Sequence, residues 1–199
     1  IVNYRSIRDI GGQLESNATL PTLIGDFTLH RRFSGGPLGG EAGLRVQAHS
    51  HYRSSDSAFD SDIDPDDIAD GRDVSRLSVR ADWRRNWIFG PGLVGSVFGE
   101  GTADIYSFRQ DAEYAGTVTR LHGAAAAELR WPWTGSTADG AAHVIEPVAQ
   151  VVVAPSDTSD IPNEDSALVE FDEGNLFSLG RFSGSDGREE GRRMNLGLS

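Results

Sequence analysis

The sequence predicts an all-β chain whose antiparallel strands form part of a transmembrane barrel. Apolar and polar residues alternate with a period of two in several segments, as they do in strands that have two different faces. The links between these segments alternate between long and short, which is typical of outer-membrane barrels. The Trp residues gather at one end of the expected strands, as in an aromatic girdle.

Five segments separate into an apolar and a polar face. They are 27–30, 44–49, 77–84, 121–131 and 145–153. A strand at 93–106 is also expected, although its faces do not separate. With strands near 1–8 and at the C-terminus, about eight strands are expected in all. Because so few strands close only the smallest barrels, we expect an open, curved piece of a larger barrel with unpaired edges.

The links give the expected strands an orientation. In chain order they are 9–22, 34–40, the Asp-rich link after Arg53, 89–92, 109–116, 132–140 and 155–191. If the long links are extracellular, Phe33, Trp83, Trp87, Trp131 and Trp133 all lie at the opposite interface. The alternative is that these are core side chains of a secreted soluble β-sandwich, since Trp is common in β cores.

Composition excludes several classes. The 199 residues carry a net charge of -12, and all 18 basic residues are Arg. The absence of Cys excludes a disulfide scaffold, a Cys-ligated zinc site and a thiol nucleophile. The acidity argues against a nucleic-acid partner, and no apolar run approaches the ~18 residues of a membrane-spanning helix. The chain begins with Ile1 without a signal peptide and ends within an expected strand, so we expect a piece of a longer protein.

Motifs for metal binding or catalysis are incomplete. Asp60, Asp62 and Asp64 match the start of an EF-hand loop, but Pro65 and Gly71 stand where that loop needs Gly and Glu. We therefore expect a solvated extracellular loop at 56–73, with loose divalent bridging to phosphates left open. His49 and His51 share a strand face without a third ligand, and no G-x-S-x-G is present. The sequence predicts no enzyme, no cofactor and no specific metal site.

Motifs in the C-terminal part carry a family resemblance. They are His143-Val144-Ile145-Glu146-Pro147, Ile161-Pro162-Asn163-Glu164-Asp165-Ser166, Asn175-Leu176-Phe177, Arg181-Phe182-Ser183-Gly184-Ser185-Asp186 and Asn195-Leu196-Gly197-Leu198. This succession resembles the C-terminal half of the barrel of the LPS-assembly protein LptD, also called organic solvent tolerance protein. In 186–191 the Arg is displaced by one position from the family pattern.

The resemblance implies a function and partners. It implies that residues 1–199 are a partial LptD-like barrel domain, without the family's periplasmic jellyroll, in the outer membrane of a Gram-negative bacterium. It implies a translocon that inserts lipopolysaccharide (LPS) into the outer leaflet, with LPS, the lipoprotein LptE and periplasmic LPS-bridge proteins as partners. The alternatives are a passive porin, an outer-membrane lipid hydrolase and the soluble β-sandwich.

Such a wall needs a lipid face and a polar lumen. We expect Leu44, Val46, Leu77, Val79, Leu129 and Val151 on the outer, convex face. Expected lumen-facing residues are Arg32, Arg45, Arg80, Arg84, Glu128, Arg130, Glu146 and Gln150. Guanidinium groups suit phosphate because they bind it bidentately. The alternative is that these arginines pair with wall acids such as Asp82 and merely brace the wall.

The link 155–191 is expected to fold over the barrel mouth, because it carries spaced hydrophobic residues that a solvated loop does not need. Its candidate motif residues are Pro162, Asn163, Asp165, Ser166, Asn175, Leu176, Phe177, Arg181, Gly184 and Asp186. We expect Asp165 or Asp186 to pin the loop through Arg181 or Arg188, with Leu176, Phe177 and Phe182 buried. The alternative is a flexible surface loop.

Overall fold

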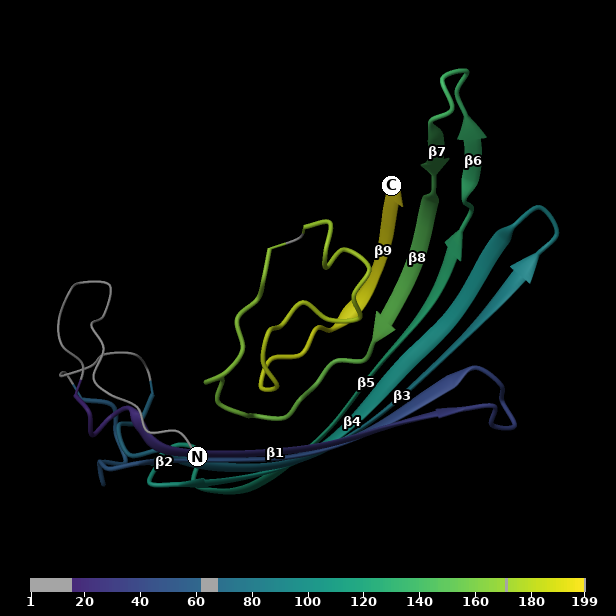
Figure 1. The fold of residues 1–199 in the computed structure, drawn as a ribbon. Coiled ribbons are helices and arrows are strands. Elements are labelled where there is room, and N and C mark those ends of the chain that lie inside the picture. Colours follow the sequence, from purple (N-terminus) through teal and green to yellow (C-terminus); the bar gives the residue numbers. More distant parts are fainter. Residues whose placement is uncertain (1–15, 62–67, 171, 199) are drawn as a thin grey trace.

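The computed structural model describes residues 16–61, 68–170 and 172–198, and strands are the regular elements of this part of the chain. The strands are β1 (Pro21–Ser34), β2 (Glu41–Arg53), β3 (Asp73–Phe89), β4 (Leu93–Arg109), β5 (Gly116–Arg130), β6 (Trp133–Ser136), β7 (Ala142–Ile145), β8 (Pro147–Ala154) and β9 (Gly191–Leu198). Seven of them form one antiparallel sheet in the order β1-β2-β3-β4-β5-β8-β9. The sheet is curved and open, with β1 and β9 at its two edges (Figure 1). The expectation of an open barrel fragment is confirmed.

The two faces of the sheet differ in character. On the convex outer face, Leu44, Leu77, Val79, Leu129 and Val151 are 39–50% exposed. Val46 lies opposite Val79 in the β2–β3 register, so it belongs to the same face. The concave inner face carries polar and charged side chains, and the loop between β8 and β9 lies on this side (Figure 1). This sheet leaves its apolar face uncovered and covers its polar face.

The two ends of the sheet also differ. At one end, which we call the turn end, short turns at 35–40 and 90–92 join β1 to β2 and β3 to β4. At the other, the link end, 54–72 and 110–115 join β2 to β3 and β4 to β5. The turn at 35–40 needs glycine, because Gly40 has a φ of +77° and a Cβ there would overlap the carbonyl oxygen of Arg84.

Aromatic side chains gather at the turn end. Phe33 and Trp83 both lie opposite Ala42 on its neighbouring strands, and Trp87 lies opposite Gly95. Trp131 follows β5 at the same end, with its ring centroid 5.3 Å from that of Trp133. The four Trp and Phe33 therefore lie at one end of the sheet.

Two sequence expectations need adjustment. The segment 132–140, expected as a turn, contains the start of a separate two-stranded hairpin, in which Trp133 of β6 pairs with Ile145 of β7. Trp133, Thr134 and Gly135 pair with residues of β7, and this hairpin is separate from the seven-stranded sheet. The turn that joins β6 to β7 is therefore shorter than expected. The expected strand near 1–8, most of the link 9–22, and 62–67 of the Asp-rich link lie outside the described residues. In the described part of the chain, no helix is long and apolar enough to span a membrane.

Candidate functional site

The covering loop is our name for residues 155–190, of which 155–170 and 172–190 are described and lie against the inner face of the sheet (Figure 1). The loop begins partway along the sheet, because the pairing of β8 with β5 ends at Val153 and Ala125, in the middle of β5. Ile161 of the loop packs against a small core made by Val74, Tyr106 and Phe108. Tyr106 also donates a hydrogen bond from its hydroxyl to Asp186 Oδ1 at 3.0 Å. The loop is therefore fixed to β3 and β4 by both apolar and polar contacts.

Four buried arginines lie beneath the loop near the link end: Arg53, Arg72, Arg76 and Arg120, which we call the arginine cluster. Their side chains are 2–6% exposed. Burying a guanidinium is costly unless acids and acceptors surround it. Two acids of the wall supply part of this compensation, since Arg120 pairs with Asp104 at 2.8 Å and Arg72 pairs with Asp111.

The loop residue Glu164 supplies further compensation. Its Oε2 accepts from Arg53 Nη2 at 2.9 Å and lies 3.2 Å from His51 Nε2. Its Oε1 accepts from Arg72 Nη1 at 3.2 Å. Burial alone raises the pKa of this carboxyl, but the hydrogen bond with His51 and the charge of Arg53 outweigh burial and lower the pKa to about 2. Glu164 is therefore an ionised carboxylate that joins the loop to two wall arginines.

Asp165 and Asp186 converge on Arg76 of β3. Arg76 Nη1 donates to Asp165 Oδ2 at 2.9 Å and to Asp186 Oδ1 at 3.1 Å. Burial works against ionisation of Asp165, yet the hydrogen bond from Arg76 lowers its pKa to about 2. The pKa of Asp186 is raised by burial and by the adjacent charge of Asp165. The two acids fix the loop as expected, but their partner is Arg76 of the wall and not an arginine of the loop.

The prediction that Asp165 or Asp186 contacts Arg181 or Arg188 was wrong. Arg181 Nε lies 3.0 Å from Glu189 Oε1 within the loop, and Arg188 Nη2 lies 3.4 Å from Asp104 Oδ2 of β4. The physical reason is the direction of the covering loop: its acids face the sheet, where Arg76 is buried and needs a counter-charge.

Other motif residues shape the loop. Asn163 Nδ2 donates to the carbonyl of Ser166 at 2.7 Å, and Ser166 N donates back to Asn163 Oδ1 at 3.0 Å. Asn175 Nδ2 donates to the carbonyl of Glu170 at 2.7 Å, and Pro162 is buried. Position 184 needs glycine, because a Cβ there would overlap the carbonyl oxygen of Asp165.

The remaining apolar residues of the loop lie in two places: Leu176 and Phe177 lie toward β9, whereas Phe182 lies beside Gly187 within the loop. Leu176, Phe177 and Phe182 are half-buried, and Phe177 lies against Gly197 of β9. The carbonyl of Phe177 accepts from Gln150 Nε2 at 2.9 Å. The expected burial of these three side chains is therefore partial. Phe171, another hydrophobic residue of this loop, lies outside the described residues.

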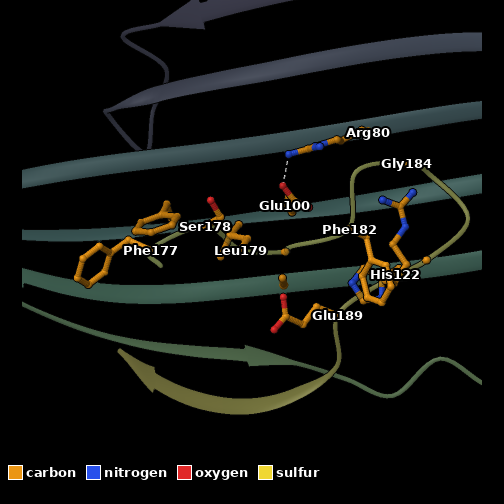
Figure 2. A pocket seen from close by; sticks show the side chains of 14 residues that line it. Arg80, Glu100, His122, Phe177, Ser178, Leu179, Phe182, Gly184 and Glu189 are labelled. Carbon is orange, nitrogen blue, oxygen red and sulfur yellow. Dashed lines mark hydrogen bonds and ion pairs between the residues drawn. The ribbon is translucent and has the colours of Figure 1, made fainter. Parts of the chain in front are cut away.

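The polar residues expected in the lumen occupy the turn-end half of the inner face. Arg32 pairs with Asp82 at 2.8 Å, and Arg80 of β3 pairs with Glu100 of β4 (Figure 2). Arg45 lies opposite Arg80 in the register of β2 and β3. These residues line a cavity of about 350 Å³, and a second cavity of about 380 Å³ shares Arg80 and Glu100 and is bordered by the covering loop (Figure 2).

Glu128 joins the remaining expected residues. It lies 2.8 Å from Arg130 Nε and 3.4 Å from Arg84 Nη2, and it accepts from Gln150 Nε2 at 2.9 Å. Arg130 also lies 3.5 Å from Glu146. All eight expected residues are thus on or beside the inner face, and most of the arginines have an acidic neighbour. These pairs support the interpretation that the arginines pair with wall acids and brace the wall.

The histidine pair contacts acids. The rings of His49 and His51 lie 5.7 Å apart, with His49 3.3 Å from Asp26 and His51 beside Glu164. Among the residues that the structure describes, no group of three His, Asp or Glu side chains is arranged to hold a metal ion.

Sequence reasoning missed the arginine cluster. Arg76 stands two positions from Ser78 and four from Arg80 on the polar side of β3, so the period of two could have placed it on the inner face. Asp104 was missed because β4 could not be oriented. Arg53 and Arg72 stand at and beyond strand ends, where periodicity gives no signal.

These features together define a class of protein. An open antiparallel sheet with an apolar convex face, a charged concave face and a loop folded into its hollow is part of the wall of a membrane β-barrel. The family model of LPS transport system D, LptD, matches residues 14–199. The chain therefore belongs to the LptD family and is part of an LPS transport component. No curated protein matches the sequence.

Proposed function

We propose that this chain forms part of the wall of an outer-membrane translocon that inserts LPS into the outer leaflet. The observation that carries the proposal is the contrast between the two faces of the same strands. On β3, Val79 projects from the apolar outer face, while its neighbour Arg80 lines an inner cavity. Membership in the LPS transport family gives this contrast its proposed use.

The chemistry of LPS fits such a wall. Its acyl chains are compatible with the lipid that the outer face meets, whereas its phosphates and sugars need polar partners along the path. The inner face offers several guanidinium groups around the two cavities, including Arg45, Arg80 and Arg84. Guanidinium binds phosphate bidentately and keeps its charge at any physiological pH. In this proposal the wall guides the lipid, and no covalent bond is broken.

The proposed orientation places the link end outside the cell and the turn end toward the periplasm. Long extracellular loops and short periplasmic turns are usual in such barrels. The aromatic side chains of the turn end, such as Trp83 and Trp87, then lie at the interface between the membrane and the periplasm, where indole rings are favoured. The proposed partners, LptE and the periplasmic LPS-bridge proteins, follow from the family resemblance.

Paired substitutions in the complete protein test the proposal. Arg80→Gln with Arg84→Gln removes two inner charges and keeps the outer face intact. We expect normal assembly, measured as folded protein in outer membranes, and at least a severalfold decrease in newly delivered LPS at the cell surface. The Arg80→Lys, Arg84→Lys variant keeps the charges but loses bidentate geometry, and it should give an intermediate rate. Normal delivery of LPS by the folded Gln variant would contradict the proposal.

A further inference from the structure

We infer that the arginine cluster is a binding site for phosphate groups, and that Glu164, Asp165 and Asp186 of the covering loop occupy it as internal substitutes. A phosphorylated lipid that binds the cluster would displace these carboxylates and lift the loop from the wall. The inference deepens the proposed function, on which it rests for the source of the phosphate.

Donors from two parts of the wall converge on a single carboxylate, that of Glu164. Glu164 accepts from Arg53 and Arg72, which belong to two different parts of the wall, at 2.9 and 3.2 Å, and its Oε2 lies 3.2 Å from His51 Nε2, a nitrogen that Arg53 Nη1 also approaches at 3.0 Å. Three such groups around one pair of oxygens form the kind of site that binds a phosphate, which presents three or more acceptor oxygens to guanidinium groups.

Two acids of the loop crowd around Arg76. Asp165 and Asp186 share its Nη1 nitrogen, so two negative charges lie beside one donor atom. Within the described chain, the Nε of Arg76 is buried without a hydrogen-bond partner. A phosphate carries close to two negative charges on one centre. It can therefore replace both carboxylates and also engage the remaining donor.

Positive and negative charges are divided unequally between the wall and the covering loop. The wall holds the four arginines with Asp104 and Asp111, and the loop brings Glu164, Asp165 and Asp186, together with Asp157, whose Oδ2 lies 3.7 Å from Arg120 Nε. The opposite case is Arg188, a loop cation that lies 3.4 Å from wall Asp104. When the loop leaves, the four arginines of the cluster outnumber the two wall acids, Asp104 and Asp111. An anion is then needed to compensate the remaining positive charges.

The position of the arginine cluster in the sheet also fits a lipid headgroup. The cluster lies near the link end, with Arg53 at the end of β2 and Arg72 one residue before β3. In the proposed orientation this end faces the outer leaflet, where the phosphates of LPS lie. The carboxylates and an arriving headgroup would then compete for the same donors.

Binding of inorganic pyrophosphate to the complete protein in detergent tests the inference. Equilibrium dialysis with labelled pyrophosphate, at constant ionic strength, gives the dissociation constant. We expect Glu164→Gln to tighten binding about tenfold, because it weakens the internal competitor and keeps the donors. We expect Arg76→Gln to weaken it by a similar factor. Glu190→Gln is the matched control, because Glu190 accepts a hydrogen bond from Asp157 N within the loop.

Tryptic cleavage of the covering loop gives the second readout. Saturating pyrophosphate should accelerate cleavage after Arg181 severalfold, and a sodium chloride control of equal ionic strength should not. A parallel arm with micelles that contain lipid A, against micelles with a neutral phospholipid, distinguishes a lipid headgroup from free phosphate. Unchanged pyrophosphate affinity in both folded variants would overturn the inference and show a permanent structural plug. The proposed LPS transport would be untouched by that result, since this assay involves no transport.

Discussion

Asp165 and Asp186 each hold the backbone of the other. Asp165 Oδ1 accepts the N–H of Asp186 at 2.8 Å, and Asp186 Oδ2 accepts the N–H of Asp165 at 3.2 Å. Two segments of the covering loop, about 20 residues apart in sequence, are thereby closed into one unit. Because both carboxylates also accept from Arg76, the same pair closes the loop and fixes it to the sheet.

Removal of Asp186 should therefore release the loop. We expect Asp186→Ala to increase the rate of proteolysis within 156–190 by at least tenfold, since Arg76 and Tyr106 lose a buried partner. Breaking a buried charged pair costs up to about 3–5 kcal/mol, and part of this returns because the repulsion from Asp165 disappears. Asp160→Ala, an exposed acid of the same loop, is the control and should leave the rate unchanged. Equal rates in both variants would contradict the pinning role.

Two glycines of the loop form a matched pair. Gly184→Ala should loosen the loop, because the new Cβ meets the backbone carbonyl of Asp165, which cannot rotate away. Such overpacking costs roughly 1–3 kcal/mol. Gly180→Ala should be tolerated, since the nearest atom to its Cβ is Glu189 Cβ at 4.0 Å. Hydrogen exchange of the loop peptides measures the difference, and equal protection in the two variants would contradict this packing.

Acid should detach the loop within a defined range of pH. The pKa of Glu164 is lowered from 4.5 to about 2 in the folded protein, so its contribution is complete above about pH 4.5 and is lost as the pH falls toward 2. This shift corresponds to roughly 3 kcal/mol. Asp165 acts in the same direction. Asp186 opposes it, because a raised pKa means that protonation on acidification relieves its repulsion with Asp165.

Hydrogen exchange between pH 7 and 2.5, corrected for the intrinsic exchange rate, follows this detachment. We expect protection of 156–190 to stay constant down to about pH 4.5 and to fall below it. Glu164→Gln should have lower protection at neutral pH and a flatter profile. If protection of the wild-type loop instead falls between pH 7 and 5, a titratable group other than Glu164 controls the detachment.

The outer face should not tolerate charge. Val79→Arg places a guanidinium among lipid chains, which costs about 2–4 kcal/mol at the midplane of a membrane, so we expect less folded protein in outer membranes. Arg80→Gln changes the next residue on the opposite face and should assemble normally. Full assembly of Val79→Arg together with failure of Arg80→Gln would mean that the inner and outer faces are reversed.

The sequence allowed the strands and their faces to be predicted because period two is a local signal. It failed for β4, whose outer face carries Gly95, Gly99 and Gly101 where apolar side chains would have identified it. The partners of the arginine cluster could not be predicted either. Arg53 and Glu164 are 111 residues apart, and Arg76 and Asp186 are 110 apart. Such pairs depend on how the covering loop folds back, which no local pattern records.

The measurement that tests the account most directly is site-specific photo-crosslinking at two adjacent positions of β4 in the complete protein in cells. Phe98 lines both inner cavities, while Val97 is 41% exposed on the outer face. A photoreactive residue at Phe98 should capture LPS, and capture should stop when LPS supply from the periplasm is blocked. The same residue at Val97 should capture membrane lipid whether or not LPS is supplied. Capture of transported LPS at Val97 but not at Phe98 would contradict the central claim that LPS passes along the inner face.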